Sequence, residues 1–65
     1  MKLQFNGETV ESAGGTLADL LEEQGLGGAV VATAVNGRFV ARTLRDGCAL
    51  KDGDRVEAVA PMQGG

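Results

Sequence analysis

Two Asn-Gly pairs constrain the fold of this chain more than any other feature of its sequence. Asn6-Gly7 separates "MKLQF" from "ETVE", and Asn36-Gly37 separates "AVVATAV" from "RFVA". Asparagine and glycine both tolerate the positive φ that a two-residue hairpin turn requires. The sequence therefore predicts two β-hairpins.

The strands of these hairpins show the alternation expected of a sheet with one buried face. The first strand places its apolar residues at every second position, and the strand at 29–35 is rich in small and β-branched residues. The alternation leaves two sides that could face the core. The larger valines favour the side of Val31, Thr33 and Val35, and the alternative is the side of Val30, Ala32 and Ala34.

A single helix is predicted between the hairpins, in "TLADLLEEQG". Thr16 is a favourable N-cap, and Asp19 three residues later forms a variant of the capping box. Three leucines follow at helical spacing, and Gly25 is the expected stop. A helix of about nine residues is marginal alone, so it requires packing against a sheet.

The segment after the second hairpin has no clear period. In residues 42–54 we expect Leu44 and Leu50 to anchor an irregular stretch, with a turn at 51–54. "RVEAVA" at 55–60 alternates again and predicts the last strand, which Pro61 ends because proline lacks an N–H group.

The predicted order is strand, strand, helix and three strands, which indicates the α+β class. Hairpins with one crossing helix favour a mixed sheet of about five strands packed on that helix. Pairing the first strand with the last in parallel gives the β-grasp, or ubiquitin-like, arrangement. We expect residues 1–60 to form this domain and residues 61–65 to form a flexible C-terminal diglycine tail.

Composition excludes several function classes. The net charge of −3 argues against nucleic-acid binding, and no apolar run is long enough to span a membrane. The chain has no histidine and one cysteine, Cys48, so we expect no structural zinc site, no metal and no ready general base. Cys48 is expected to act as a small apolar residue. We expect a cytoplasmic protein that is not itself an enzyme.

Three motifs resemble the ThiS family of sulfur carrier proteins of thiamin biosynthesis: "VNGRFVAR" at 35–42, "LKDGDRVE" at 50–57, and the final Gly64-Gly65. The resemblance covers essentially the whole chain. The sequence departs from the family pattern at Ala41, where relatives often carry proline.

The resemblance implies a role for the tail. An E1-like, ThiF-like enzyme would use ATP to adenylate the carboxylate of Gly65, and a sulfur donor such as a cysteine desulfurase would supply the sulfur of a thiocarboxylate. A ThiG-like thiazole synthase would then take the sulfur. This chain would bind no cofactor itself. Gly64 would let the backbone enter a narrow channel, which Met62 and Gln63 would line.

A partner surface is expected on the open face of the sheet. Phe39, Val59 and Arg55 are its candidate residues, joined by the apolar side chains of Ala34 and Met62. The alternative for Phe39, one of only two aromatic residues, is a place in the core, and the small size of the domain favours the core.

Other functions fit the same pattern. The small subunit of molybdopterin synthase, a sulfur carrier for the molybdenum cofactor, has the same fold and tail. A ubiquitin-like protein modifier would be joined to lysines through Gly65. A plain binding module of this fold would not need its tail.

Overall fold

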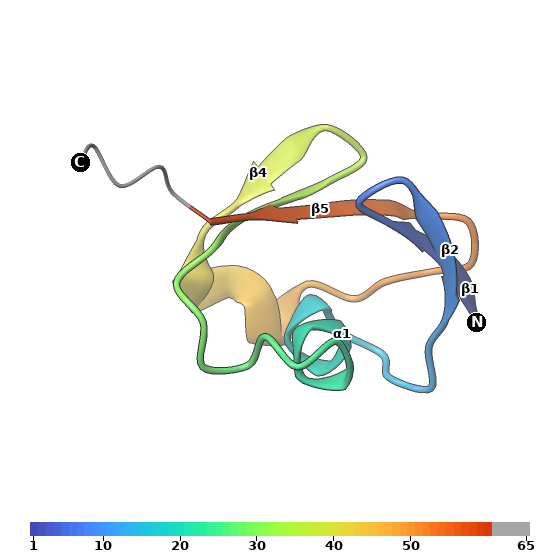
Figure 1. The fold of residues 1–65 in the computed structure, drawn as a ribbon, viewed down its shortest axis with the longest axis horizontal. Coiled ribbons are helices and arrows are strands. Elements are labelled where there is room, and N and C mark those ends of the chain that lie inside the picture. Colours follow the sequence, from blue (N-terminus) through green and yellow to red (C-terminus); the bar gives the residue numbers. More distant parts are fainter. Residues whose placement is uncertain (61–65) are drawn as a thin grey trace.

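Residues 1–60, the part of the chain that the computed structural model describes, form a five-stranded sheet with one α-helix on one face (Figure 1). The helix, α1, spans Leu17–Glu23, and a 3₁₀ helix, η1, spans Arg42–Gly47. The strands are β1 (Lys2–Phe5), β2 (Glu8–Glu11), β3 (Ala32–Val35), β4 (Arg38–Val40) and β5 (Arg55–Val59).

Both predicted hairpins are confirmed, and their turns are nearly identical. Asn6 and Gly7 have φ of 51° and 84°, while Asn36 and Gly37 have φ of 52° and 83°. Two successive positive φ values define the type I′ turn, whose twist matches that of the flanking strands. The turns pair β1 with β2 and β3 with β4, both antiparallel.

The sheet has the strand order β2-β1-β5-β3-β4, so the last strand lies at its centre. β5 runs parallel to β1 and antiparallel to β3. Each hairpin therefore contributes one neighbour to β5: β1 from the start of the chain and β3 from its middle. This is the predicted β-grasp arrangement.

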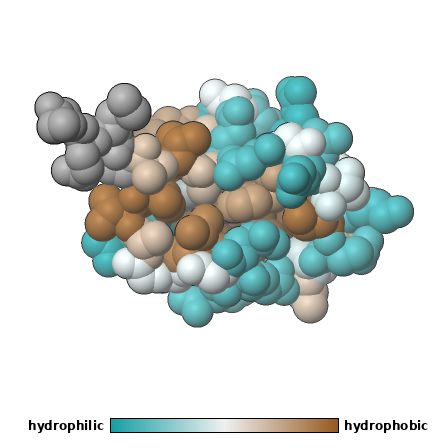
Figure 2. All heavy atoms as spheres, in the orientation of Figure 1, coloured by the Kyte–Doolittle hydropathy of each residue, from teal (hydrophilic) through white to brown (hydrophobic). Residues whose placement is uncertain are grey.

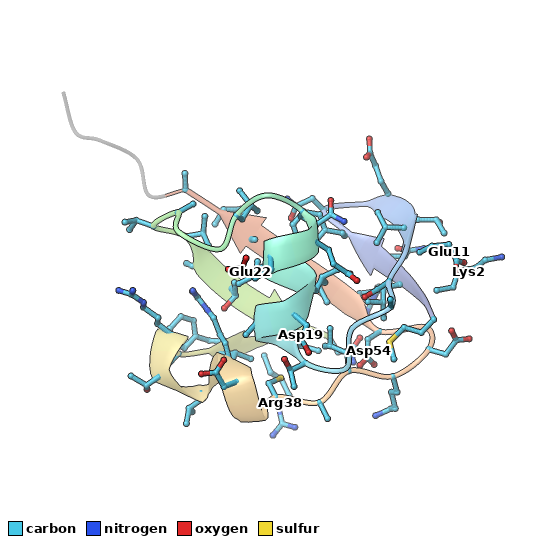
Figure 3. The ribbon with its side chains drawn as sticks, turned by 90° about the horizontal axis from the view of Figure 1, so that it is seen from below. Lys2, Glu11, Asp19, Glu22, Arg38 and Asp54 are labelled. Carbon is cyan, nitrogen blue, oxygen red and sulfur yellow. The ribbon has the colours of Figure 1, made fainter. Side chains whose placement is uncertain are left out.

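Helix α1 begins with the predicted capping box. The Thr16 hydroxyl accepts the N–H of Asp19 at 3.2 Å, and the Asp19 carboxylate accepts the N–H of Thr16 at 3.2 Å. The helix has seven residues, and Gly25 follows it with φ of 78°. The helix lies over one face of the sheet (Figure 3), and its apolar stripe belongs to the buried core. The buried core consists of Leu3, Leu17, Leu20, Leu21, Leu50, Val56 and Ala58.

The core-facing side of the predicted third strand is confirmed, but its predicted start is wrong. Thr33 is buried, and Val31 and Val35 pack against the core, as predicted. The strand starts only at Ala32, however, because β5 ends at Val59, which is the partner of Ala32. Residues 29–31 therefore lie outside the ladder.

The predicted anchor role is right for Leu50, which is buried, and wrong for Leu44, which is 63% exposed. The next residue, Arg45, turns inward from η1 instead. Its Nη2 donates to the Val31 carbonyl at 2.6 Å and its Nε to the Thr33 hydroxyl at 3.0 Å. Arg45 thus holds η1 to the start of β3, and Leu44 is left on the outside.

Among residues 1–60, no helix is long and apolar enough to cross a membrane.

Candidate functional site

The candidate site lies on the outer face of the sheet, where β5 approaches residue 60. β5 alternates strictly: Val56 and Ala58 are buried toward α1, while Arg55, Glu57 and Val59 are exposed. The helix covers the inner face only (Figure 1). The outer face of β5 is therefore free to contact another molecule.

The strand register brings four apolar residues together on this face. Val59 pairs with Ala32, and Ala34 pairs with Phe39, so the two alanines lie between the larger side chains. Phe39 is 73% exposed and Val59 is 59% exposed. We call this group the apolar corner: Ala32, Ala34, Phe39 and Val59.

A shallow groove of about 430 Å³ continues the apolar corner from Phe39 across the end of β4 to η1. Figure 2 shows apolar residues gathered at the end of the molecule where β4, η1 and the end of β5 lie. The groove includes Leu44, the predicted anchor that is exposed instead. Its lining residues are Phe39, Val40, Thr43, Leu44, Gly47 and Cys48.

Two asparagine side chains hold the backbone of β5. At its start, Asn36 Oδ1 accepts the N–H of Arg55 at 2.9 Å. Near its end, Asn6 Oδ1 accepts the N–H of Ala58 at 2.9 Å, and Asn6 Nδ2 donates to the Ala58 carbonyl at 3.1 Å. The strand that leads to residues 61–65 is thus fixed by both hairpin turns.

A buried carboxylate completes the attachment at the start of β5. Asp54 is 5% exposed and accepts hydrogen bonds from Asn36 Nδ2 and from the N–H of Lys51, each at 2.9 Å (Figure 3 shows its place). These hydrogen bonds, that of Asn36 first, lower the pKa of Asp54 below its usual value. Asp54 therefore stays ionised within the fold at neutral pH.

Comparison with known proteins decides the family. The family model described as the ThiS family matches residues 3–65. The chain belongs to the ThiS family. No curated protein sequence matches it at a significant level.

Two solved structures are similar to this ThiS-family chain over its full length. One is a crystal structure of a thiamine biosynthesis protein (ThiS) from Geobacter metallireducens, with 32% identity, a TM-score of 0.85 and complete coverage of both chains. The other is an NMR solution structure of a thiamine biosynthesis protein from the same organism, with 35% identity and a TM-score of 0.78. It covers 100% of this chain and 88% of that one. The β-grasp fold is therefore shared at substantial identity.

The structure places the predicted partner residues of this ThiS-family chain in two groups. Phe39 and Val59 lie together in the apolar corner, so the expectation that favoured the core for Phe39 is wrong. Arg55 shares their face but lies four residues from Val59 along β5, about 13 Å away, and pairs with Gln4. Met62, Gln63, Gly64 and Gly65 fall outside the described residues.

The exposure of Phe39 had a signal in the sequence. A two-residue turn at Asn36-Gly37 fixes Phe39 opposite Ala34, and these two share a face. Since Thr33 and Val35 were expected to face the core, Ala34 and Phe39 had to face outward. No comparable signal marks Leu44, because η1 has no apolar period.

Chemistry-bearing groups are sparse in the described part of this ThiS-family chain. Residues 1–60 contain no group of three metal-ligating side chains. Cys48 is half-buried and packs against the core, which fits the small apolar role predicted for it. The candidate site thus consists of an exposed apolar surface and a firmly held strand.

Proposed function

We propose that this chain is a sulfur carrier for thiamin biosynthesis whose reacting group is the carboxylate of Gly65. The observation that carries the proposal is the apolar corner at the end of β5, immediately before the tail, in a chain whose family match extends through Gly64 and Gly65. A folded body that offers a docking face beside its tail suits a protein that presents its terminus to another enzyme.

The chemistry requires such a partner because a carboxylate is a poor electrophile. An E1-like adenylating enzyme would join the Gly65 carboxylate to the α-phosphate of ATP and release pyrophosphate. The terminal sulfur of a donor persulfide would then displace AMP and form an acyl disulfide with the Gly65 carbonyl. A thiol would cleave that S–S bond, form a new disulfide with the donor cysteine and release the Gly65 thiocarboxylate. Thiazole synthase would accept that sulfur. ATP would belong to the partner, and this chain would act as a group carrier rather than as an enzyme.

The apolar corner would supply the contact area for these partners. Exposed aromatic and aliphatic side chains that lie next to a polar surface are typical of protein interfaces. Glu57 pairs with Ala34 and lies at the border of the apolar corner, with Arg55 farther along the same face. We expect Phe39 and Val59 to dominate binding and Arg55 to add a smaller contribution at the rim.

The first test is the intact mass of the chain after incubation with ATP, the adenylating enzyme and a sulfur donor. A gain equal to the exchange of one oxygen for sulfur, mapped to Gly65, supports the proposal. The matched control is the chain without Gly65, which should gain no mass. An unchanged mass of the native chain with active partners would contradict the carrier function.

A second test separates the alternatives within the same fold. Sulfur delivered to thiazole synthase supports the thiamin pathway, whereas delivery to the large subunit of molybdopterin synthase would assign the chain to the molybdenum cofactor. Isopeptide adducts to lysines would indicate a protein modifier instead.

A further inference from the structure

The side chain of Asn6 makes a contact that a type I′ turn does not require. Asn6 has φ of 51°, and glycine or aspartate also occupies that position readily. Nevertheless its carboxamide reaches Ala58, 52 residues away in sequence, through both its oxygen and its nitrogen. The contact therefore concerns β5 rather than the turn itself.

The place of this contact along β5 is informative. The parallel pairing of β1 with β5 ends at Phe5 and Val56, and the Asn6 N–H then donates to the Val56 carbonyl at 2.9 Å. Ala58 lies past the end of β1 and turns its N–H and carbonyl groups toward that side. The Asn6 carboxamide replaces the missing strand and satisfies both groups.

β5 is consequently held on two edges to within one residue of the apolar corner. On the other edge, β3 pairs with β5 as far as Ala32 and Val59. Fixing Ala58 fixes the direction in which Val59 points and the place where the chain leaves the sheet toward residue 61.

We propose that Asn6 is a positioning residue for partner binding: its carboxamide holds Ala58 so that the apolar corner and the point where the chain leaves the sheet at residue 60 reach a partner in one fixed relation. This inference rests on the proposed carrier function. Without the contact, the end of β5 would have to be ordered on each docking event. Ordering one residue costs about a tenfold loss in affinity.

Asn36 provides a matched control because it occupies the same position in the other turn, with φ of 52°, and holds the opposite end of β5. Asn6→Gly and Asn36→Gly each keep a residue suited to positive φ and remove one attachment. Asn6→Asp keeps the turn and an acceptor, but it places a carboxylate oxygen against the Ala58 carbonyl. A residue needed only for the turn would tolerate this change.

The experiment measures ATP–pyrophosphate exchange by the adenylating enzyme at varied carrier concentration, together with amide hydrogen exchange at Ala58. Circular dichroism first sets a temperature at which every variant is folded. Asn6→Gly and Asn6→Asp should raise KM about tenfold with little change in kcat and should speed exchange at Ala58. Asn36→Gly should leave KM within about twofold of the native value.

Equal KM values for Asn6→Gly and Asn36→Gly, or a native KM for Asn6→Asp, would overturn the positioning role while leaving the carrier function intact. Absence of pyrophosphate exchange with the native chain itself would overturn the carrier function, and the positioning role with it.

Discussion

The two Asn-Gly turns have the same backbone conformation and attach the same strand, yet they attach it by different chemistry. Asn36 works with the buried carboxylate of Asp54 at the start of β5, whereas Asn6 contacts only uncharged backbone groups of Ala58 near its end. One end of the strand is thus held through a charge and the other without one. The difference separates a pH-sensitive anchor from a neutral one placed beside the apolar corner.

Removing the charged anchor should have the largest effect. We expect Asp54→Ala to lower the free energy of unfolding by about 2–4 kcal/mol. The variant loses two hydrogen bonds to a charged group, and the donors, Asn36 Nδ2 and the N–H of Lys51, are left without an acceptor. Urea denaturation followed by circular dichroism measures this loss. Asp46→Ala, at an exposed site in η1, is the control and should be nearly neutral. An equal loss in both variants would contradict the anchor role.

Glycine at either turn should produce an intermediate effect. Asn6→Gly and Asn36→Gly each remove two side-chain hydrogen bonds, so each should cost about 1–2 kcal/mol of stability. The informative comparison is with the double variants. In the Asp54→Ala background, Asn36→Gly should cost less than it does alone, whereas Asn6→Gly should keep its full cost. Thermal melts of the single and double variants supply the test, and strict additivity at both sites would refute it.

The pH dependence of stability should distinguish the two ends further. The pKa of Asp54 is lowered in the fold, so its contribution is present above its unfolded value of about 3.9 and is lost as pH falls through the lower folded pKa. The pKa values of Asp19 and Glu23 are also lowered by hydrogen bonds, and they add to the same loss. Stability of the native chain should therefore fall below about pH 4.

The slope of the free energy of unfolding against pH is the measurement that separates the variants. Asn36→Gly removes the largest cause of the Asp54 pKa shift and should flatten the slope, while Asn6→Gly should leave it unchanged. Unfolding curves between about pH 2 and pH 6 provide the comparison. If Asn6→Gly also made stability less dependent on pH, the contact of Asn6 with Ala58 would not be independent of ionisable groups.

The smallest effect on stability is expected at the apolar corner. Phe39→Ser and Val59→Ser alter exposed side chains, so the free energy of unfolding should change by no more than about 0.5–1 kcal/mol. Binding of the adenylating enzyme should nevertheless weaken clearly, and Thr9→Ala on the same face but on β2 serves as the control. Calorimetric titration of each variant provides the measurement. Unaltered binding in both serine variants would remove the corner from the interface.

The features that could be predicted from the sequence are those with local causes. Two-residue turns, the capping box of Thr16 and Asp19, and the alternation of β5 each depend on neighbours within a few residues. The attachment of Asn6 to Ala58 joins residues 52 apart and has no local pattern. The same holds for Arg45, whose contacts with Val31 and Thr33 displace Leu44 from the core.

The same division between local and distant causes explains why only part of the candidate site could be predicted. The open face and the pair Phe39 and Val59 follow from strand alternation and hairpin register. The groove along η1 does not, since the course of that segment is set by the packing of Arg45 against β3. The exposure of Leu44 therefore could not be predicted from the sequence and is known only from the structure.

The central position of β5 has a consequence for folding of the chain during its synthesis on the ribosome. Of the five described strands, the one that joins the two halves of the sheet is synthesised last. Its parallel pairing with β1 is among the most distant pairings in the sequence. A nascent chain that stalls or is cut before residue 55 lacks the middle of its sheet, so β1 and β3 would expose unpaired edges. Misfolded fragments of this kind are substrates for proteolysis, whereas a chain that has folded already carries the strand leading to its tail. A chain cut short before residue 55 should therefore fail to complete the sheet.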